Sequence, residues 1–107
     1  FIEDDLSAAP DASVLASARL GQNYPNPFNP STRIEFSIEE PGSVDLAVYD
    51  LAGRKVATLE QGTFAAGNYH VNWNGTTDSG LPAATGQYSY VLKTANGMVA
   101  RSMVLLK

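Results

Sequence analysis

From residue 32 onward, apolar and polar residues alternate along the chain with a period of two. In residues 32–38, Ile34, Phe36 and Ile38 fall on one face, while charged or polar residues fall on the other. Such alternation is typical of a β-strand with one face on the core. Similar stretches predict strands at residues 43–49, 54–59, 69–74, 87–94 and 98–106, with a short edge piece at 63–66.

Turn-forming residues separate these stretches. Residues 50–53 should close a hairpin in which Gly53 adopts a positive φ. The pair Gln61-Gly62 is expected to end the third strand, and Val56 is expected to point inward from that strand.

The strongest short hairpin signal is the pair Asn96-Gly97, between the last two expected strands. With these two residues at the centre of the turn, Tyr90 opposes Met103. The apolar residues of both strands then share one face, as the pleat of the sheet requires.

Six or seven short strands at this spacing predict an all-β fold, an immunoglobulin-like two-sheet antiparallel β-sandwich. The chain has no cysteine, so the disulfide that joins the sheets of antibody domains is absent. Trp73 is the only tryptophan, and its inward position predicts that it occupies the centre of the core.

The segment LGQNYPNPFNPST, residues 20–32, precedes the first expected strand and is called the proline segment below. Its three prolines fix φ and remove backbone donors, so neither a helix nor a central strand can run through it. We expect a stiff, extended segment along a sheet edge, with Tyr24 and Phe28 as aromatic anchors. Burial of the Phe28 ring against the end of the sandwich would hold the segment there.

Residues 1–19 are acidic and rich in Ala and Ser, which is typical of a linker or of the end of an upstream domain. A short helix at 12–19, capped by Asp11, is the alternative. We therefore expect the packed domain to span residues 20–107, after an irregular N-terminal tail. Because the chain begins with Phe1 and shows no leader, we expect a fragment or processed piece whose original N-terminus lies upstream.

The formal net charge of −4 is concentrated in the first residues, and the remainder of the chain is close to neutral. Without a basic surface, nucleic acid is not an expected partner. The chain has no apolar run of the roughly 18 residues that a transmembrane helix needs, so membrane insertion is not expected.

His70 is the only histidine and should point away from the core. The chain has no second His or Cys to complete a catalytic or metal site with it. We expect no enzyme activity and no cofactor.

The loop at 74–86 is the longest irregular stretch of the expected domain, and it carries Asn74, Thr76, Asp78 and Ser79. These oxygen donors resemble a loose calcium loop, but a single carboxylate is too few for a tight site. The alternative is a long turn in which Asp78 and Ser79 bond nearby backbone amides. We expect the turn and no metal site, and leave weak calcium binding open.

Exposed aromatic rings could form a sugar-binding platform. Most aromatic residues lie on the apolar faces of the expected strands, where core packing accounts for them. Tyr49 is out of phase with Val44, Leu46 and Val48, and one exposed ring makes a weak platform.

Several motifs, in order and with their spacing, resemble a known family. They are LGQNYPNPFNPSTRIEFSI, VYDLAGRKVATL, AGNYHVNWNG, GLPAATGQYSYVL and the closing MVLLK. Together they look like the C-terminal sorting domain of the type IX secretion system, also called the Por secretion system sorting domain. That family is similar to the Ig-like domain of flagellar hook-capping proteins. The resemblance covers residues 20–107 and says nothing about residues 1–19.

The resemblance implies a non-enzymatic secretion signal. Such domains follow large secreted or surface proteins of the Bacteroidetes and related phyla, and the outer-membrane translocon recognises them as an export address. The implied partners are that type IX translocon, its sorting and attachment proteins, and an upstream cargo domain, with the protein itself a monomer. The implied location is the cell surface or the medium, reached through the periplasm and the outer membrane.

In this family the signal concentrates in the last two strands. The residues that the resemblance implies in recognition are Gly86, Tyr88, Tyr90, Gly97, Met103, Val104, Leu105, Leu106 and Lys107. The proline motif adds Asn23, Pro25, Pro27, Phe28 and Pro30. Because nothing follows the last strand to cover its edge, we expect a partner to add a strand there, backbone to backbone. The alternatives are a structural Ig-like spacer and a carbohydrate-binding module of a secreted enzyme.

Overall fold

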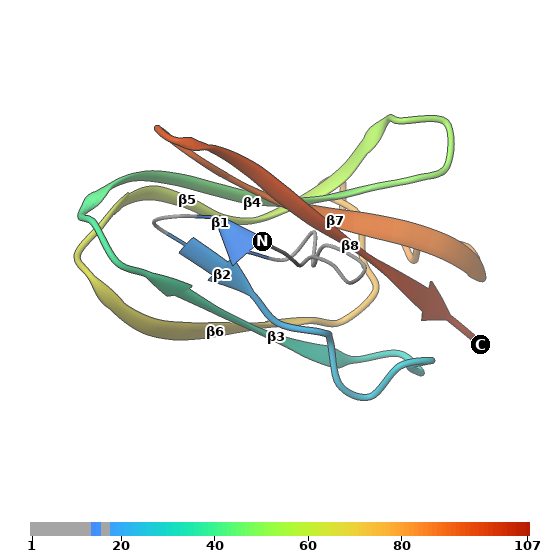
Figure 1. Cartoon of the computed structure of the whole chain (residues 1–107). Helices are drawn as coiled ribbons and strands as arrows, with labels where there is room; N and C mark the ends of the chain where they lie inside the picture. The colour runs from blue at the N-terminus through green and yellow to red at the C-terminus, as the bar shows by residue number, and fades with distance from the viewer. Residues whose placement is uncertain (1–13, 16–17) are drawn as a thin grey trace, which may run out of the picture.

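The computed structural model describes residues 14–15 and 18–107, and every regular element within them is a β-strand (Figure 1). Two short strands come first, β1 (Val14–Leu15) and β2 (Ala18–Leu20). The long strands are β3 (Thr32–Ile38), β4 (Gly42–Tyr49), β5 (Lys55–Phe64), β6 (Gly67–Trp73), β7 (Gly86–Thr94) and β8 (Gly97–Leu105). No helix long and apolar enough to cross a membrane is found among the described residues.

The strands form two antiparallel sheets that face each other. Sheet A has the order β1-β2-β3-β6, and sheet B has the order β5-β4-β7-β8. Figure 1 shows β3 and β6 below β4 and β7. This arrangement confirms the predicted all-β, immunoglobulin-like sandwich. The six long strands are β3 to β8, β2 is a seventh, and the two-residue β1 pairs with β2.

The core lies between the sheets and follows the predicted alternation in most strands. All three predicted inward residues of β3 are buried. Trp73 is also buried, with its ring centre 5.7 Å from that of Phe28, but it is the last residue of β6 and closes one end of the core. The predicted central position of this tryptophan is therefore wrong, and the largest fully buried side chain among the described residues is Tyr90.

Strand β5 differs from the prediction because it continues through the Gln-Gly pair as far as Phe64. Its pairing with β4 skips one residue at Val56 and one at Leu59. Each skipped residue reverses the alternation, so Ala57 is buried and Val56 is only half-buried. Gly62 has a φ of 147°, which a glycine adopts without strain, so the pair does not end the strand.

The closing hairpin forms, but its register is shifted by two residues from the prediction. Thr94 pairs with Gly97, so Ala and Asn occupy the centre of the turn instead of Asn and Gly. This register pairs Leu92 with Val99, and both side chains are buried. The predicted register would have put Leu92 opposite Arg101, whereas Arg101 opposes Tyr90 in the structure. The observed register therefore departs from the one that the turn residues favour.

The shift leaves the burial pattern unchanged, because side chains alternate between faces with a period of two. Tyr90 opposes Arg101, where Met103 was predicted, and Tyr88 opposes Met103. The buried apolar side chains of this hairpin still include Tyr88, Tyr90, Met103 and Leu105.

Sheet A begins before the predicted start of the packed domain. Strand β2 pairs with β3, and its residues Ala18 and Leu20 are buried. The alternative of a short helix is wrong where the structure describes the chain, because β1 and β2 are strands. The acidic residues 1–13 lie outside the described residues.

Candidate recognition site at the proline segment and the last strand

The proline segment crosses from sheet A to sheet B at one end of the sandwich. The backbone of Tyr24 exchanges two hydrogen bonds with that of Arg33 in β3, with N···O distances of 2.9 and 2.8 Å. Further along, the amide of Phe28 donates to the carbonyl of Val104 at 3.0 Å, and the carbonyl of Phe28 accepts from the amide of Leu106 at 2.9 Å. One short segment therefore ties the first long strand to the last.

Phe28 lies as predicted, packed against the end of the sandwich with 1% of its surface exposed. Its ring contacts Trp73, and its backbone forms a parallel bridge with Leu105 of the edge strand β8. The other predicted anchor is wrong, because Tyr24 is 79% exposed and only its backbone binds the sheet. Both residues are next to a proline in the sequence, so the local sequence could not indicate which ring is buried and which is exposed.

Asn23 holds the proline segment from inside. It is 2% exposed, and its Nδ2 donates to Thr32 Oγ1 at 3.0 Å and to the carbonyl of Pro25 at 3.2 Å. The hydroxyl of Thr32 donates to the same carbonyl at 2.9 Å. A buried amide with several satisfied bonds stabilises one conformation of the segment.

The hydroxyl of Tyr90 connects sheet B to the start of the proline segment. It accepts from the amide of Asn23 at 2.8 Å and donates to the carbonyl of Gly21 at 2.7 Å. The side chain is fully buried, and burial raises the pKa of Tyr90 to about 12. The phenol therefore keeps its proton above pH 10, and with it the bond that it donates to Gly21.

The second half of the β8 edge is covered, contrary to the prediction of an open edge. Asn26 Oδ1 accepts from the amide of Val104 at 3.0 Å. Gln22 Nε2 donates to the carbonyl of Ser102 at 3.0 Å. Together with the backbone bonds of the proline segment described above, these contacts occupy groups that an added strand would need. Strand addition at this stretch would require displacement of the proline segment.

The residues implied in recognition divide into a buried and an exposed group. The buried group contains Tyr88, Tyr90, Met103 and Leu105 of the hairpin and Asn23 and Phe28 of the proline motif. The half-buried or exposed group contains Gly86, Gly97, Val104, Leu106, Lys107, Pro25, Pro27 and Pro30. Side chains of the first group act through the fold, and only the second group presents surface to a partner.

Part of the exposed group gathers at one end of the sandwich. This surface is called the latch end, and it comprises Pro25, Pro27, Pro30, Leu106 and Lys107. Leu106 bonds to Phe28 through the backbone, and the amide of Lys107 donates to Thr85 Oγ1 at 3.2 Å. Figure 1 shows the C-terminus close to the loop of the proline segment. Gly97 begins β8 at its other end and is not part of this surface.

Sequence analysis missed three side chains that hold the proline segment, those of Gln22, Asn26 and Arg101. Arg101 Nε donates to the carbonyl of Leu20 at 2.8 Å, which ties β8 to β2. Asn26 bonds to the amide of Val104, 78 residues further along the chain, so no local signal could have indicated this bond. A period-two pattern contains no signal for an arginine that bonds to a strand of the other sheet.

The oxygen-rich loop between β6 and β7 covers part of the edge of β5. Asp78 Oδ1 accepts from the amide of Thr58 at 2.9 Å, and the amide of Asp78 donates to the carbonyl of Val56 at 3.0 Å. The predicted bond of Asp78 to a backbone amide is confirmed, whereas Ser79 Oγ lies 2.8 Å from Thr77 Oγ1 instead. Within residues 14–15 and 18–107, no group of three or more His, Cys, Asp or Glu side chains could hold a metal ion.

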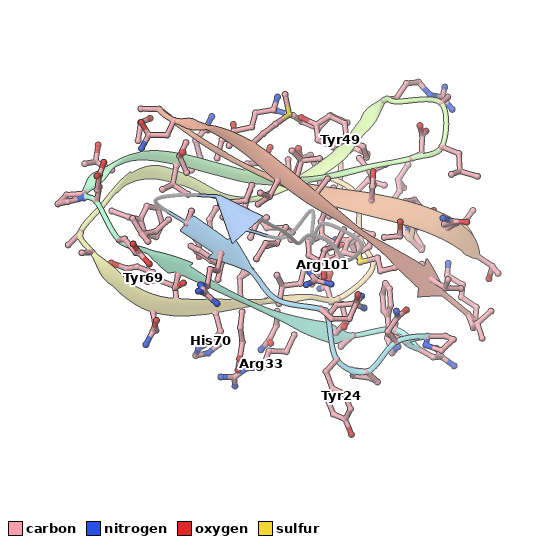
Figure 2. All side chains as sticks on the ribbon, viewed as in Figure 1. Tyr24, Arg33, Tyr49, Tyr69, His70 and Arg101 are labelled. Atoms are coloured by element: carbon pink, nitrogen blue, oxygen red, sulfur yellow. The ribbon has the colours of Figure 1, made fainter. Side chains whose placement is uncertain are left out.

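His70 and Tyr49 lie on the outer faces of the two sheets, as the alternation predicts. His70 is exposed on sheet A, in the position that pairs with Glu35 (Figure 2). Tyr49 is half-buried on sheet B, where Lys93 Nζ lies 5.7 Å from its ring centre and 3.4 Å from its hydroxyl. This ring is partly covered, which makes it a poor sugar platform.

Solved structures with this fold include two proteins of Porphyromonas gingivalis. Dimeric latent PorU is 20% identical with a TM-score of 0.64, and the match covers 86% of this chain and 10% of PorU. PorZ, described as an essential bacterial surface component of the type-IX secretion system, is 19% identical with a TM-score of 0.56, and the match covers 80% of this chain and 11% of PorZ.

A third protein with this fold comes from a different class. The alkylpurine DNA glycosylase AlkC of Pseudomonas fluorescens, bound to DNA with an abasic site analogue, is 14% identical with a TM-score of 0.55. The match covers 86% of this chain and 31% of AlkC. The chain thus spans less than a third of each of these three proteins, and identities this low indicate a shared fold alone.

The family comparison is more specific than these structural likenesses. No curated protein matches the chain. Residues 26–98 match the family model of the FlgD Ig-like domain. Because this match covers more than half of the chain, the protein belongs to the FlgD Ig-like domain family.

Proposed function

We propose that this Ig-like domain is the sorting domain of a larger secreted protein. It would direct an upstream cargo through the type IX outer-membrane secretion system to the cell surface or the medium. In this proposal the domain is a binding module without enzyme activity or cofactor, and its partners are the translocon and its sorting and attachment proteins.

One observation carries the proposal: two motifs that bear the resemblance to sorting domains come together in one unit. NYPNPF and MVLLK lie at opposite ends of the domain sequence, yet Phe28 forms a bridge with Leu105 and backbone bonds with Val104 and Leu106. A receptor could therefore contact both motifs on one surface. The likeness in fold to PorZ, a component of the type IX system, supports the same assignment.

The proposed mechanism is recognition of the folded latch end. Leu106 is 48% exposed and offers an apolar contact, and the exposed Lys107 beside it offers a positive charge. The prolines of the adjacent loop present a stiff surface that loses little entropy on binding. Because the proline segment covers the neighbouring edge of β8, the receptor in this mechanism contacts side chains and does not add a strand.

The test uses residues 1–107 fused behind a fluorescent reporter, in a type IX-competent bacterium and in the same strain without its translocon. We expect the reporter outside the cells only in the first strain. Leu106→Ser combined with Lys107→Ala should reduce export without lowering the melting temperature, because both side chains are exposed. The matched control is Met98→Ser with Lys93→Ala, an exposed apolar–lysine pair toward the other end of β8, and it should export normally. Equal export from both strains, or normal export of the latch-end variant, would contradict the proposal.

A structural spacer is the second candidate, and the family match favours it. The match is to the FlgD Ig-like domain, and it includes residues 26–98 but not the last residues of β8. A spacer needs only a stable fold between neighbouring domains. A fusion that folds and stays inside type IX-competent cells would support the spacer and exclude the sorting role.

A further inference from the structure

A groove lies on the outer face of sheet A, and the proposed export role does not use it. Its volume is about 390 Å³, and the polar side chains around it come from β2, β3 and β6. They are Arg19, Arg33, Glu35, Ser37, Asn68 and His70. Figure 2 shows Arg33 and His70 projecting to the same side of the sheet, with Tyr24 projecting to that side as well.

Gly21 keeps the middle of this groove open. It extends the line of β2, and its amide donates to the carbonyl of Glu35 at 2.8 Å. A Cβ at residue 21 would lie 3.1 Å from that carbonyl oxygen, so the backbones approach closely here. The missing side chain leaves a hollow next to the exposed Arg19, on the sheet face where His70 pairs with Glu35.

Two guanidinium groups stand toward the two ends of the groove. Arg19 pairs with Ser37 across the strands, and Arg33 lies four residues before Ser37 on β3. At the rise of a β-strand, this spacing places the two arginines roughly 13 Å apart along the strand. The ion pair of Arg33 with Glu35 uses Nε at 3.2 Å, which leaves the two terminal nitrogens of a half-exposed guanidinium for a ligand carboxylate.

We propose that this groove binds an acidic polysaccharide, a chain of sugars that carries uronate carboxylates. The two arginines bind carboxylates on sugars that are not adjacent, and Asn68 and His70 bond the hydroxyls between them. Tyr24 bridges to Arg33 through its backbone, and its 79% exposed ring offers a flat apolar surface to a sugar at that end.

Glu35 favours a sugar chain over an acidic peptide. On β3, Glu35 stands between Arg33 and Ser37, and Ser37 is the residue that pairs with Arg19. A carboxylate at this position accepts a bond from a hydroxyl but repels a second acid. A run of Asp or Glu would place a carboxylate against it, whereas each sugar of a uronate chain carries hydroxyls beside its carboxylate and can turn these toward Glu35. Because the whole chain carries a net charge of −4, attraction to a polyanion depends on this local surface.

The test is affinity electrophoresis of the 107-residue chain in native gels that contain polygalacturonate, dextran or polyglutamate. We expect retardation by polygalacturonate alone. Arg19→Gln combined with Arg33→Gln should raise the dissociation constant by about tenfold or more. Tyr24→Ala should raise it by a smaller factor. The matched control, Arg54→Gln with Lys55→Gln, removes the same charge from exposed positions at the start of β5 in sheet B and should leave retardation unchanged.

Three results would each overturn the inference. They are no retardation by polygalacturonate, equal loss of retardation in the control, and equal retardation by polyglutamate, which would assign the groove to acidic peptides. All substituted side chains are exposed, and unchanged melting temperatures show that each variant is folded. The inference does not rest on the export role, so the double arginine variant should export the reporter normally.

Discussion

Phe28 and Tyr24 differ in what they contribute, although both rings stand beside prolines. Phe28 is buried against Trp73, whereas Tyr24 is mostly exposed. Phe28→Ala should lower the free energy of unfolding by about 3–5 kcal/mol, because it removes buried surface and leaves a cavity. Tyr24→Ala should change it by less than about 0.5 kcal/mol. Urea denaturation of both variants measures the difference, and equal stabilities would show that the proline segment is only a tether.

Tyr90 gives the stability a dependence on alkaline pH. Burial raises its pKa from 10.0 to about 12, so the folded state keeps a proton that the unfolded state loses. The resulting stabilisation is fully present below pH 10 and is lost as the pH rises from 10 toward 12. Denaturation of Tyr90→Phe across this interval should show a shallower decline. A smaller decline should remain, because burial also raises the pKa of Tyr88. An unchanged slope would show that Tyr90 does not cause the decline.

The same substitution should be costly at neutral pH for a separate reason. Without its hydroxyl, the buried amide of Asn23 and the carbonyl of Gly21 lose their partner. The expected loss is about 1–3 kcal/mol in the free energy of unfolding. Tyr49→Phe is the control and should be nearly neutral, since Tyr49 is only half-buried and its hydroxyl accepts a long bond of 3.4 Å from the exposed Lys93.

Among the elements, β2 tests where the packed domain begins. Its residues Ala18 and Leu20 are buried on the core side of sheet A. A chain that starts at residue 18 should therefore keep its fold. A chain that starts at residue 21 should lose at least about 2–5 kcal/mol, the usual cost of one large buried aliphatic side chain. The melting temperatures of the two truncated chains test this prediction. Equal values would show that β2 adds no stability and that the packed domain begins near residue 20.

The strands could be predicted from the sequence where one face is buried and no residue is inserted. Strand β3 follows its alternation throughout. In β5 the alternation is interrupted by two skipped residues, which depend on pairing with β4 and leave no local signal. In the closing hairpin the turn residues indicated one register, and the structure has another, in which Leu92 pairs with Val99. Both registers place the same side chains on the buried face, so the alternation could not distinguish them.

The candidate site was predictable only in part, for a related reason. The rigidity of the proline segment and the burial of Phe28 could be predicted from the residues themselves. Prolines restrict the backbone, and burial of a large apolar ring stabilises the fold. The covered edge of β8 did not follow. It depends on contacts such as that of Asn26 with Val104, between residues far apart in the sequence, and no periodic pattern encodes them.

On the scale of the whole molecule, the proline segment makes the two ends of the domain sequence interdependent. It bonds to β3 through Tyr24 and to β8 through Phe28, and it also reaches β7 through the hydroxyl of Tyr90. The last strand therefore has neighbours on both sides along its second half, β7 and the proline segment. A change in either the proline segment or β8 should disturb the latch end, and the two kinds of change differ in severity.

That difference separates folding from recognition in the proposed export role. Phe28→Ala weakens the attachment of the proline segment but leaves Leu106 and Lys107 on the surface. It should lower stability and still permit export of the reporter at low growth temperature, where a weakened domain stays folded. Leu105→Asp places a charge at a position with 0% exposure, which is costly for the whole core. It should abolish both stability and export at every temperature.

The assay measures exported reporter at two growth temperatures beside the melting temperature of each purified variant. Normal export of Leu105→Asp would mean that the translocon recognises an unfolded sequence, and it would contradict the proposed recognition of a folded surface. A Phe28→Ala variant that is folded at low temperature yet is not exported would mean that the receptor depends on the position of the proline segment itself. In that case, the receptor would recognise the latch end only when the buried Phe28 holds it in place. Asn26→Ala removes the bond to the amide of Val104 and should then impair export in the same way.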